Sequence, residues 1–122
     1  MMKSLIRASA LAAASLAAFL AYARADAQEP ATVKEQFGVL CATCHGENGD
    51  GNGPTAKILN IKPRNFTDCA AMAKIPDATL FTAIRDGGAA VGLNSAMPRW
   101  RESLDDQQIK ALVAYVRSRC KR

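Results

Sequence analysis

The chain has 122 residues and a net charge of +5, from 16 Lys and Arg against 11 Asp and Glu. This length allows one small domain, and one Trp, two Tyr and four Phe are too few for the stacking surfaces that bind single-stranded nucleic acid. Because no long basic block occurs, the charge indicates a mildly basic docking surface, and nucleic acid is not expected as a partner.

The first 27 residues have the pattern of a secretory signal peptide. Lys3 and Arg7 precede sixteen uncharged residues, 8–23, and a small-residue exit site ends at Ala27. The apolar run is shorter than the roughly 20 residues of a membrane-spanning helix. We therefore expect cleavage after Ala27, with a retained membrane anchor as the alternative. Residues 28–122 would form the mature domain in the periplasm, without stable membrane insertion.

The first expected helix runs over residues 31–44, where apolar residues recur at helical spacing and Pro30 suits a first turn. Gly46 ends this helix. Residues 46–73 are rich in Gly, Pro and Asn and predict a long loop, with one helical turn near 55–59. Loops this long are uncommon inside a compact domain unless they wrap something.

Two more helices are expected in the second half of the chain. Asp77 would cap a short helix that stops at Gly87 and Gly88. After a second loop, Ser103 and Asp106 resemble a capping box at the start of the final helix. The apolar faces of these helices are formed by Leu80, Phe81 and Ile84, and by Ile109, Leu112, Val113 and Val116.

The expected fold is all-α, with three main helices, two long loops and no strand pattern. The large apolar side chains are too few to fill a core alone. A domain of this size is only marginally stable without a covalent or cofactor staple. Something other than protein is therefore expected in the core.

The segment Cys41-Ala-Thr-Cys44-His45 is the strongest chemical signal, and the chain has only this one histidine. A structural zinc site needs four ligands, but Cys69 and Cys120 are single and about fifty residues apart. A thioredoxin-like redox pair would lie near a βαβ pattern, which is missing. A simple disulfide would leave the histidine and the wrapping loops unexplained.

Cys-x-x-Cys-His is the attachment signature of c-type haem. On a helix, Cys41 and Cys44 face the same side, so both sulfurs can reach the vinyl groups of one porphyrin, and His45 can turn its imidazole to the iron. One haem per chain would also supply the missing apolar core. The sequence therefore predicts haem c, with iron, as the cofactor.

The chain resembles the class I c-type cytochromes, in particular the small bacterial type with a single haem. The resemblance covers about residues 30–122, and it implies the cytochrome c fold, in which the first and last helices cross. It rests on CATCHG, the loop GENGDGNGP, the segment KPRNFTD, the helix end RDGG, the loop AMPRW and the terminal LVAYVRSRC.

The second axial ligand is expected to be Met97. It lies in a Gly-rich loop before Pro98, between two helices, and it matches the Met-Pro loop of the family. Met72, in AAMAK, is the alternative, although a methionine packed in the core explains that position better. A distal position that is open or filled otherwise is the third possibility.

Further contacts to the haem group are expected from the loops. The resemblance implies that the ring N–H of His45 donates to a proline carbonyl, with Pro54 as the best match and Pro63 as the alternative. Trp100 and Arg99 are candidates for hydrogen bonds to a propionate. Four basic residues are candidates for a ring around the haem edge or for ordinary solvated charges: Lys57, Lys62, Arg64 and Lys74.

Two smaller features remain. Asn48, Asp50 and Asn52 imitate the opening of a calcium-binding loop, but Leu59 stands where the last acidic ligand is required, so turn formation explains them better. Cys69 and Cys120 remain after the haem takes its pair, and in an oxidising compartment we expect them to form a disulfide rather than two buried thiols.

The function predicted from these features is electron transfer, not catalysis. Histidine and methionine would saturate the iron, so that no substrate binds, and an exposed haem edge would pass single electrons to a dehydrogenase, reductase or terminal oxidase. A haem subunit held permanently in a larger dehydrogenase or oxidase is the alternative. A gas sensor or peroxidase is a further one, which would need an open sixth position.

Overall fold

The structure is a computed structural model that describes residues 31–120, and the expected signal peptide lies outside the described residues. The chain forms six α-helices and a short 3-10 helix in this part, and residues 31–120 contain no strand. The elements are α2 (Val33–Leu40), α3 (Ala42–His45), α4 (Pro54–Ile58), α5 (Cys69–Met72), α6 (Asp77–Asp86), η1 (Gly88–Val91) and α7 (Asp106–Ser118).

The expected first helix is present but divided. Thr32 caps α2, and the side chain of Glu35 reaches back to the Thr32 backbone in a capping box. Cys41 departs from helical geometry, at φ −117°, and separates α2 from α3. Backbone hydrogen bonds still continue across it, from the Cys41 N–H to Phe37 and from the His45 N–H to Cys41. The helical turn expected near residues 55–59 is present as α4, whereas α5 was not expected.

The predicted cap of the second helix is wrong by one residue. Pro76 is the N-cap of α6 and Asp77 is its first residue. Asp77 is already inside the helix, and its carboxylate accepts a 2.7 Å hydrogen bond from Nε of Arg117 on α7.

The predicted cap of the last helix is also wrong. Ser103 belongs to a turn in which its N–H donates to the Trp100 carbonyl. Asp105 caps α7 instead and forms a capping box with Gln108, which supplies the longer side chain that this motif requires.

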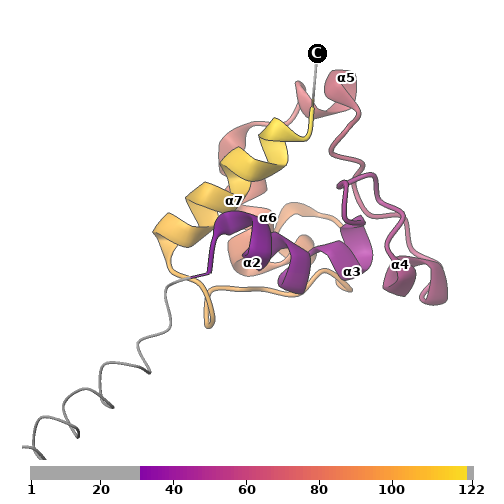
Figure 1. The fold of residues 1–122 in the computed structure, drawn as a ribbon, viewed down its shortest axis with the longest axis horizontal. Coiled ribbons are helices and arrows are strands. Elements are labelled where there is room, and N and C mark those ends of the chain that lie inside the picture. Colours follow the sequence, from indigo (N-terminus) through magenta and orange to yellow (C-terminus); the bar gives the residue numbers. More distant parts are fainter. Residues whose placement is uncertain (1–30, 121–122) are drawn as a thin grey trace, which may run out of the picture. The chain divides into compact units, whose positions relative to one another are not determined.

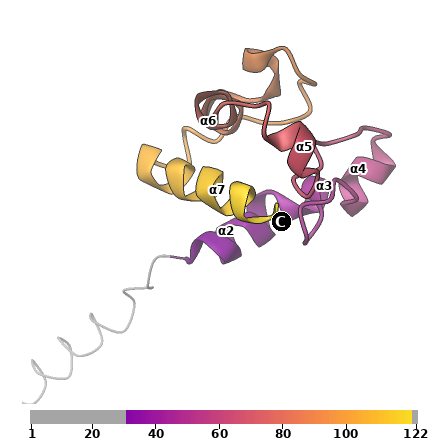
Figure 2. The same ribbon diagram turned by 90° about the horizontal axis from the view of Figure 1, so that it is seen from above.

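Helix α7 lies beside both α2 and α6, as the two perpendicular views show (Figures 1 and 2). Phe37 on α2 and Ile109 and Leu112 on α7 are almost fully buried between them. The Phe37 and Tyr115 rings lie 5.1 Å apart between their centroids. This contact joins the first and last described helices, as the cytochrome c fold requires.

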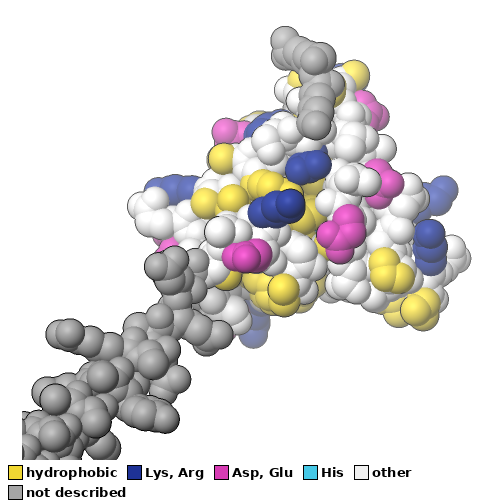
Figure 3. Space-filling model, viewed as in Figure 1, with side chains coloured by type: hydrophobic (Ala, Val, Ile, Leu, Met, Phe, Trp, Pro, Cys, Tyr) yellow, Lys and Arg dark blue, Asp and Glu magenta, His cyan; other side chains and the backbone are white. Residues whose placement is uncertain are grey.

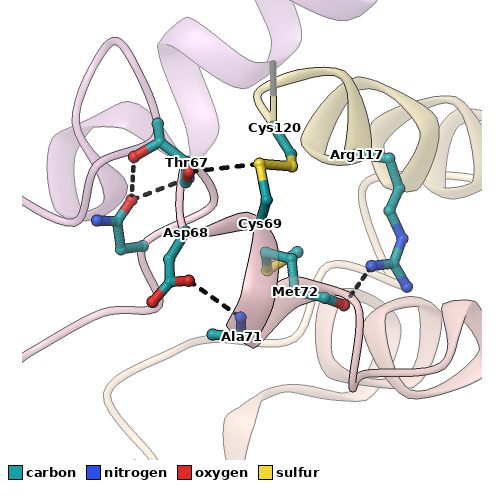
Figure 4. The surroundings of a disulfide bond; sticks show 8 residues. Thr67, Asp68, Cys69, Ala71, Met72, Arg117 and Cys120 are labelled. Atoms are coloured by element: carbon teal, nitrogen blue, oxygen red, sulfur yellow. Dashed lines mark hydrogen bonds between the residues drawn. A yellow bond between two sulfur atoms is a disulfide. The ribbon is translucent and has the colours of Figure 1, made fainter. Parts of the chain in front are cut away.

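A disulfide joins Cys69, at the start of α5, to Cys120, which follows α7 (Figure 4). Arg117 reinforces this corner, because its Nη1 donates to the Met72 carbonyl at 2.6 Å and its Nη2 donates to the Ile75 carbonyl. The end of α7 is therefore fixed to residues 69–77 by one covalent bond and by one guanidinium. None of the helices that the structure describes is long and apolar enough to cross a membrane.

Candidate haem-binding site

A cavity of about 720 Å³ opens between α3, the loops that follow it and the loop before α7. This volume lies within the range of small-molecule and cofactor sites. Five of the residues expected at the site line the cavity: Cys41, Cys44, His45, Met97 and Trp100. Phe37, Leu40, Ile84, Leu112 and Val116 supply much of its apolar wall.

The histidine wall is built from α3 and the segment around residue 65. Nδ1 of His45 lies 3.2 Å from the carbonyl oxygen of Arg64. A carbonyl only accepts, so Nδ1 carries the proton and Nε2 keeps its lone pair. The imidazole also stacks on the Phe66 ring, with 4.5 Å between the ring centroids. These two contacts fix the ring in an orientation suited to metal ligation.

The hydrogen-bond partner of His45 differs from the prediction. Pro54 is the first residue of α4, is exposed and does not line the cavity. Pro63 does line the cavity, but the carbonyl that meets Nδ1 belongs to the next residue, Arg64. The carbonyl that meets Nδ1 therefore comes ten residues after the expected Pro54 and one residue after the alternative, Pro63.

Burial shifts the titration of two groups in this wall. The pKa of His45 is lowered mainly by desolvation, while its hydrogen bond to the Arg64 carbonyl opposes the shift. The neutral imidazole is thereby favoured, and only this form can ligate a metal. Burial also raises the pKa of the Cys41 thiol to about 11. Without an attached cofactor, this thiol is protonated at neutral pH.

Gly53 lets the loop before α4 run directly against α3. Its N–H donates to the Cys44 carbonyl at 3.1 Å. A Cβ at this position would collide with the carbonyl groups of Thr43 and Cys44. The close backbone approach therefore requires glycine.

The methionine wall is the loop from Gly87 to Trp100. Its backbone is held by hydrogen bonds from the Gly88 N–H to Met97, at 3.1 Å, and from the Met97 N–H to Asn94, at 3.3 Å. Met97 is half-buried and lines the cavity. Met72 is 2 % exposed within the core cluster and does not line the cavity.

Of the two residues expected to hydrogen-bond a haem propionate, one lies at the cavity and the other does not. Trp100 lines the cavity, and its backbone N–H donates to the Ile84 carbonyl. Arg99 does not line the cavity, and its Nε forms a 3.1 Å ion pair with Glu102 on the surface. Among the basic residues named from the sequence, Lys62 and Arg64 line the cavity, but Lys57 and Lys74 do not.

In the loop at residues 48–52, which resembles the start of a calcium-binding loop, the side chains stabilise the turn itself. The Asp50 carboxylate accepts a 3.0 Å hydrogen bond from the Asn52 N–H, and hydrogen bonding with Asn52 lowers the pKa of Asp50. Within residues 31–120, no three His, Cys, Asp or Glu side chains gather as a metal site.

The residues present fit a covalently attached haem. Two thiols three positions apart and a neutral imidazole line one wall of the apolar cavity, and a thioether lines another. Sequence reasoning missed two contributors, the Arg64 carbonyl and the Phe66 ring. The one usable signal for Phe66 was a large aromatic residue inside a loop rich in Pro and Asn.

Comparisons with known proteins agree with this geometry. Residues 28–116 match the family described as cytochrome C oxidase, cbb3-type, subunit III. The chain is 37% identical over 94 residues to the cbb3-type cytochrome c oxidase subunit FixP of Azorhizobium caulinodans, covering 75% of this chain and 28% of the relative. It is 33% identical over 91 residues to subunit CcoP of Azospirillum brasilense, with the same two shares.

The chain thus spans about a quarter of the length of these curated relatives. A solved structure, the KustC0563 c-type cytochrome, superposes with a TM-score of 0.60 and 27% identity, covering 75% of this chain and all of that one. The chain therefore belongs to the family of cbb3-type cytochrome c oxidase subunit III, and it is a class I c-type cytochrome that carries covalently bound haem c.

Proposed function

We propose that this chain is a haem c electron-transfer component of a cbb3-type terminal oxidase, working in the periplasm. The observation that supports this proposal most directly is that the Cys41–His45 wall and Met97 line the same apolar cavity. The family and its curated relatives favour a subunit of an oxidase over a freely diffusing carrier. An oxidase subunit and a freely diffusing carrier would both transfer single electrons through the same haem c.

The roles of the residues follow from their placement. Cys41 and Cys44 would hold the haem through covalent bonds from their thiols, and His45 and Met97 would ligate its iron. The Arg64 carbonyl and the Phe66 ring hold the imidazole in place. When bound, the haem iron supplies a one-electron couple, and a neutral thioether ligand favours its ferrous form.

With His45 and Met97 both ligating the iron, the protein would leave no coordination position for a substrate. The chain then acts as an electron carrier rather than as an enzyme. A histidine held by two contacts and a methionine on a hydrogen-bonded loop would move little when the iron changes oxidation state, so little reorganisation would oppose electron transfer.

The experiment is to purify the tagged full chain from its native membranes in mild detergent. We expect it to copurify with a cbb3-type oxidase, with one haem c per chain, and the reduced chain to drive oxygen consumption by that oxidase. Recovery without any oxidase, but with activity when the two are mixed, would favour the free carrier. Rapid binding of carbon monoxide to the ferrous protein would contradict electron transfer and favour a sensor or peroxidase.

A further inference from the structure

The two ends of the methionine loop, residues 87–100, meet at the end of α6. The Trp100 N–H donates to the Ile84 carbonyl at 3.1 Å. The N–H of the following residue, Arg101, donates to the Arg85 carbonyl at 3.2 Å. We call this junction between the end of α6 and the end of the loop the base of the methionine loop. Because both ends of the loop are held there, the base controls how far the loop can move away from the cavity.

An ion pair joins the two sides of this base. Nη1 of Arg101 lies 3.2 Å from Oδ1 of Asp86, the last residue of α6. The other carboxylate oxygen, Oδ2, lies 3.4 Å from Nη1 of Arg85. The Asp86 side chain is 23% exposed, less than the other carboxylates that form ion pairs within residues 31–120. Partial burial strengthens its attraction to Arg101, while the exposed half of Arg101 leaves this attraction sensitive to salt.

Asp86 is poorly placed for the helix that carries it. The C-terminal end of a helix has a partial negative charge, so a carboxylate in the last turn lowers the stability of the helix. Asp86 is the final residue of α6 and therefore has this unfavourable position. The stability of α6 does not explain an acidic residue there, whereas the cation that reaches it from the end of the methionine loop does.

Most ion pairs of the domain need no functional explanation. Figure 3 shows acidic and basic side chains intermixed over the face that it presents, and a surface ion pair by itself contributes little stability. Arg99 pairs with Glu102, three positions along the chain, and Arg85 also pairs with Asp106 at the start of α7. The ion pair of Asp86 differs, because no other ion pair in the described part of the chain joins α6 to the end of the methionine loop.

We propose that Asp86 is a positioning residue for the proposed iron ligand Met97. Its ion pair with Arg101 keeps the base of the methionine loop closed and thereby keeps Met97 at the cavity. The backbone transmits this effect, because Gly88, two residues after Asp86, donates its N–H to the Met97 carbonyl at 3.1 Å. An interaction made only in the closed loop lowers the fraction of molecules in which the loop is open. This inference rests on the proposed ligation of the iron by Met97.

The first test measures how fast carbon monoxide binds to the ferrous haem-loaded protein. Carbon monoxide is uncharged, so a change of protein charge neither attracts nor repels it, and it can bind only after Met97 leaves the iron. At about 0.01 M salt, Asp86→Asn and Arg101→Gln should each accelerate binding by on the order of threefold. The double variant should match the single variants, because all three lose the same interaction. A wild-type rate in Asp86→Asn would overturn the inference.

Two matched control variants change the charge equally and leave the ion pair across the base intact. Asp106→Asn removes the other carboxylate that pairs with Arg85, and Arg99→Gln removes a cation from the methionine loop itself. Both controls should bind carbon monoxide at the wild-type rate. If Asp106→Asn accelerated binding as much as Asp86→Asn does, the loss of any negative charge near α6 would suffice, and the specific role of Asp86 would be wrong.

Salt and unfolding measurements separate positioning from a purely structural role. Raising sodium chloride from about 0.01 M to about 1 M should accelerate carbon monoxide binding in the wild type and in the charge-conserving variant Asp86→Glu, but not in Asp86→Asn. The free energy of unfolding of Asp86→Asn should change little, because losing the ion pair is offset by removing a carboxylate from the end of α6. A lower free energy of unfolding with an unchanged binding rate would show that Asp86 is structural only.

Amide hydrogen exchange tests the loop independently of the iron ligand. The Gly88 and Trp100 N–H groups form hydrogen bonds in the loop and at its base, so both should exchange faster in Asp86→Asn than in the wild type, while the amides of α2 exchange at unchanged rates. If Met97→Ala left carbon monoxide binding unchanged, the proposed ligation by Met97 would be wrong, and amide exchange would still decide whether Asp86 holds the loop. Wild-type exchange of both amides in Asp86→Asn would overturn the inference.

Discussion

The two walls of the haem cavity are held in different ways. On the histidine wall, one ring is fixed by a hydrogen bond to the Arg64 carbonyl and by stacking on Phe66, and α3 continues the hydrogen bonding of α2. On the methionine wall, Met97 lies in a loop that backbone hydrogen bonds to Gly88 and Asn94 hold. The first wall is fixed at the ligand itself, and the second only at the backbone that carries it.

This difference predicts which changes each wall tolerates. Disturbing the histidine wall should affect attachment and folding together, because the same short segment provides both. Disturbing the methionine wall should open the iron while the domain stays folded, because Met97 and Trp100 are only partly buried where they pack against the core.

The largest effect is expected from Cys41→Ala with Cys44→Ala, which removes both covalent bonds to the haem. Acidified organic solvent should then extract all haem from the variant and none from the wild type. Extraction from the wild type would show that the histidine wall holds the cofactor without covalent bonds.

The next largest effect is expected from Met97→Ala. Water or hydroxide should replace the thioether and favour ferric iron, so the midpoint potential should fall by on the order of 0.1 V or more, within the span of about 0.8 V that axial ligands cover. Carbon monoxide should bind the ferrous variant readily and the wild type poorly.

Met72→Ala is the matched control for this experiment. Met72 is buried away from the cavity. Its truncation should cost about 2–5 kcal/mol in the free energy of unfolding and leave the potential unchanged. If Met72→Ala opened the iron and Met97→Ala did not, the two walls would have been assigned wrongly.

The corner at Cys69 and Cys120 should contribute stability without touching either wall. These residues close a loop of 51 residues. Replacing both with Ala should lower the free energy of unfolding by on the order of 4 kcal/mol in the chain-entropy model, with unchanged haem spectra. Labelling of the denatured, unreduced protein should detect no free thiol, and two labelled thiols per chain would disprove the bridge in solution.

Two glycines allow the walls to be compared by the same substitution. A Cβ at Gly53 would meet the carbonyls of α3, and one at Gly88 would meet the Asn94 carbonyl and Met97. Each change to Ala should cost roughly 1–3 kcal/mol. Gly88→Ala should also admit carbon monoxide, whereas Gly53→Ala should not.

Gly38→Ala serves as the control for both glycine variants. Gly38 lies in α2, and a Cβ there would meet no atom within 4 Å. This substitution should stabilise the protein by up to about 1 kcal/mol, because alanine favours the helix. Carbon monoxide binding by Gly53→Ala would remove the proposed difference between the walls.

The smallest effect is expected at the start of α2, away from both walls. Hydrogen bonds from Thr32 lower the pKa of Glu35. Because its pKa is lower in the folded state, its contribution to stability is complete above the unfolded carboxyl pKa of about 4.3 and is lost as the pH falls through the folded value. Glu35→Gln should weaken the pH dependence of urea unfolding in this acidic range, and an unchanged dependence would contradict this.

The contrast between the walls also explains what the sequence could reveal. Cys41, Cys44 and His45 are adjacent, so their chemistry is readable from spacing alone. Met97 was reached by comparing two candidates. The Arg64 carbonyl was not foreseen, because any residue supplies a carbonyl and only the path of the loop decides which one meets Nδ1. Phe66 was missed for a similar reason, since stacking joins segments far apart in sequence.

The helices show the same limit. The three long helices follow from apolar periodicity, but their caps depended on competing partners. Asp77 was expected to cap α6, yet Arg117, forty residues later, takes its carboxylate. Ser103 was expected to cap α7, yet it is held in a turn by Trp100. Local patterns predicted the elements, and tertiary contacts decided where they begin.

The central claim, that His45 and Met97 ligate one haem iron from the two walls, can be tested most directly by X-ray absorption at the iron edge of the purified ferrous protein. We expect one sulfur ligand beside the nitrogen ligands, lost in Met97→Ala and kept in Met72→Ala. A wild-type spectrum with only nitrogen and oxygen ligands would contradict it.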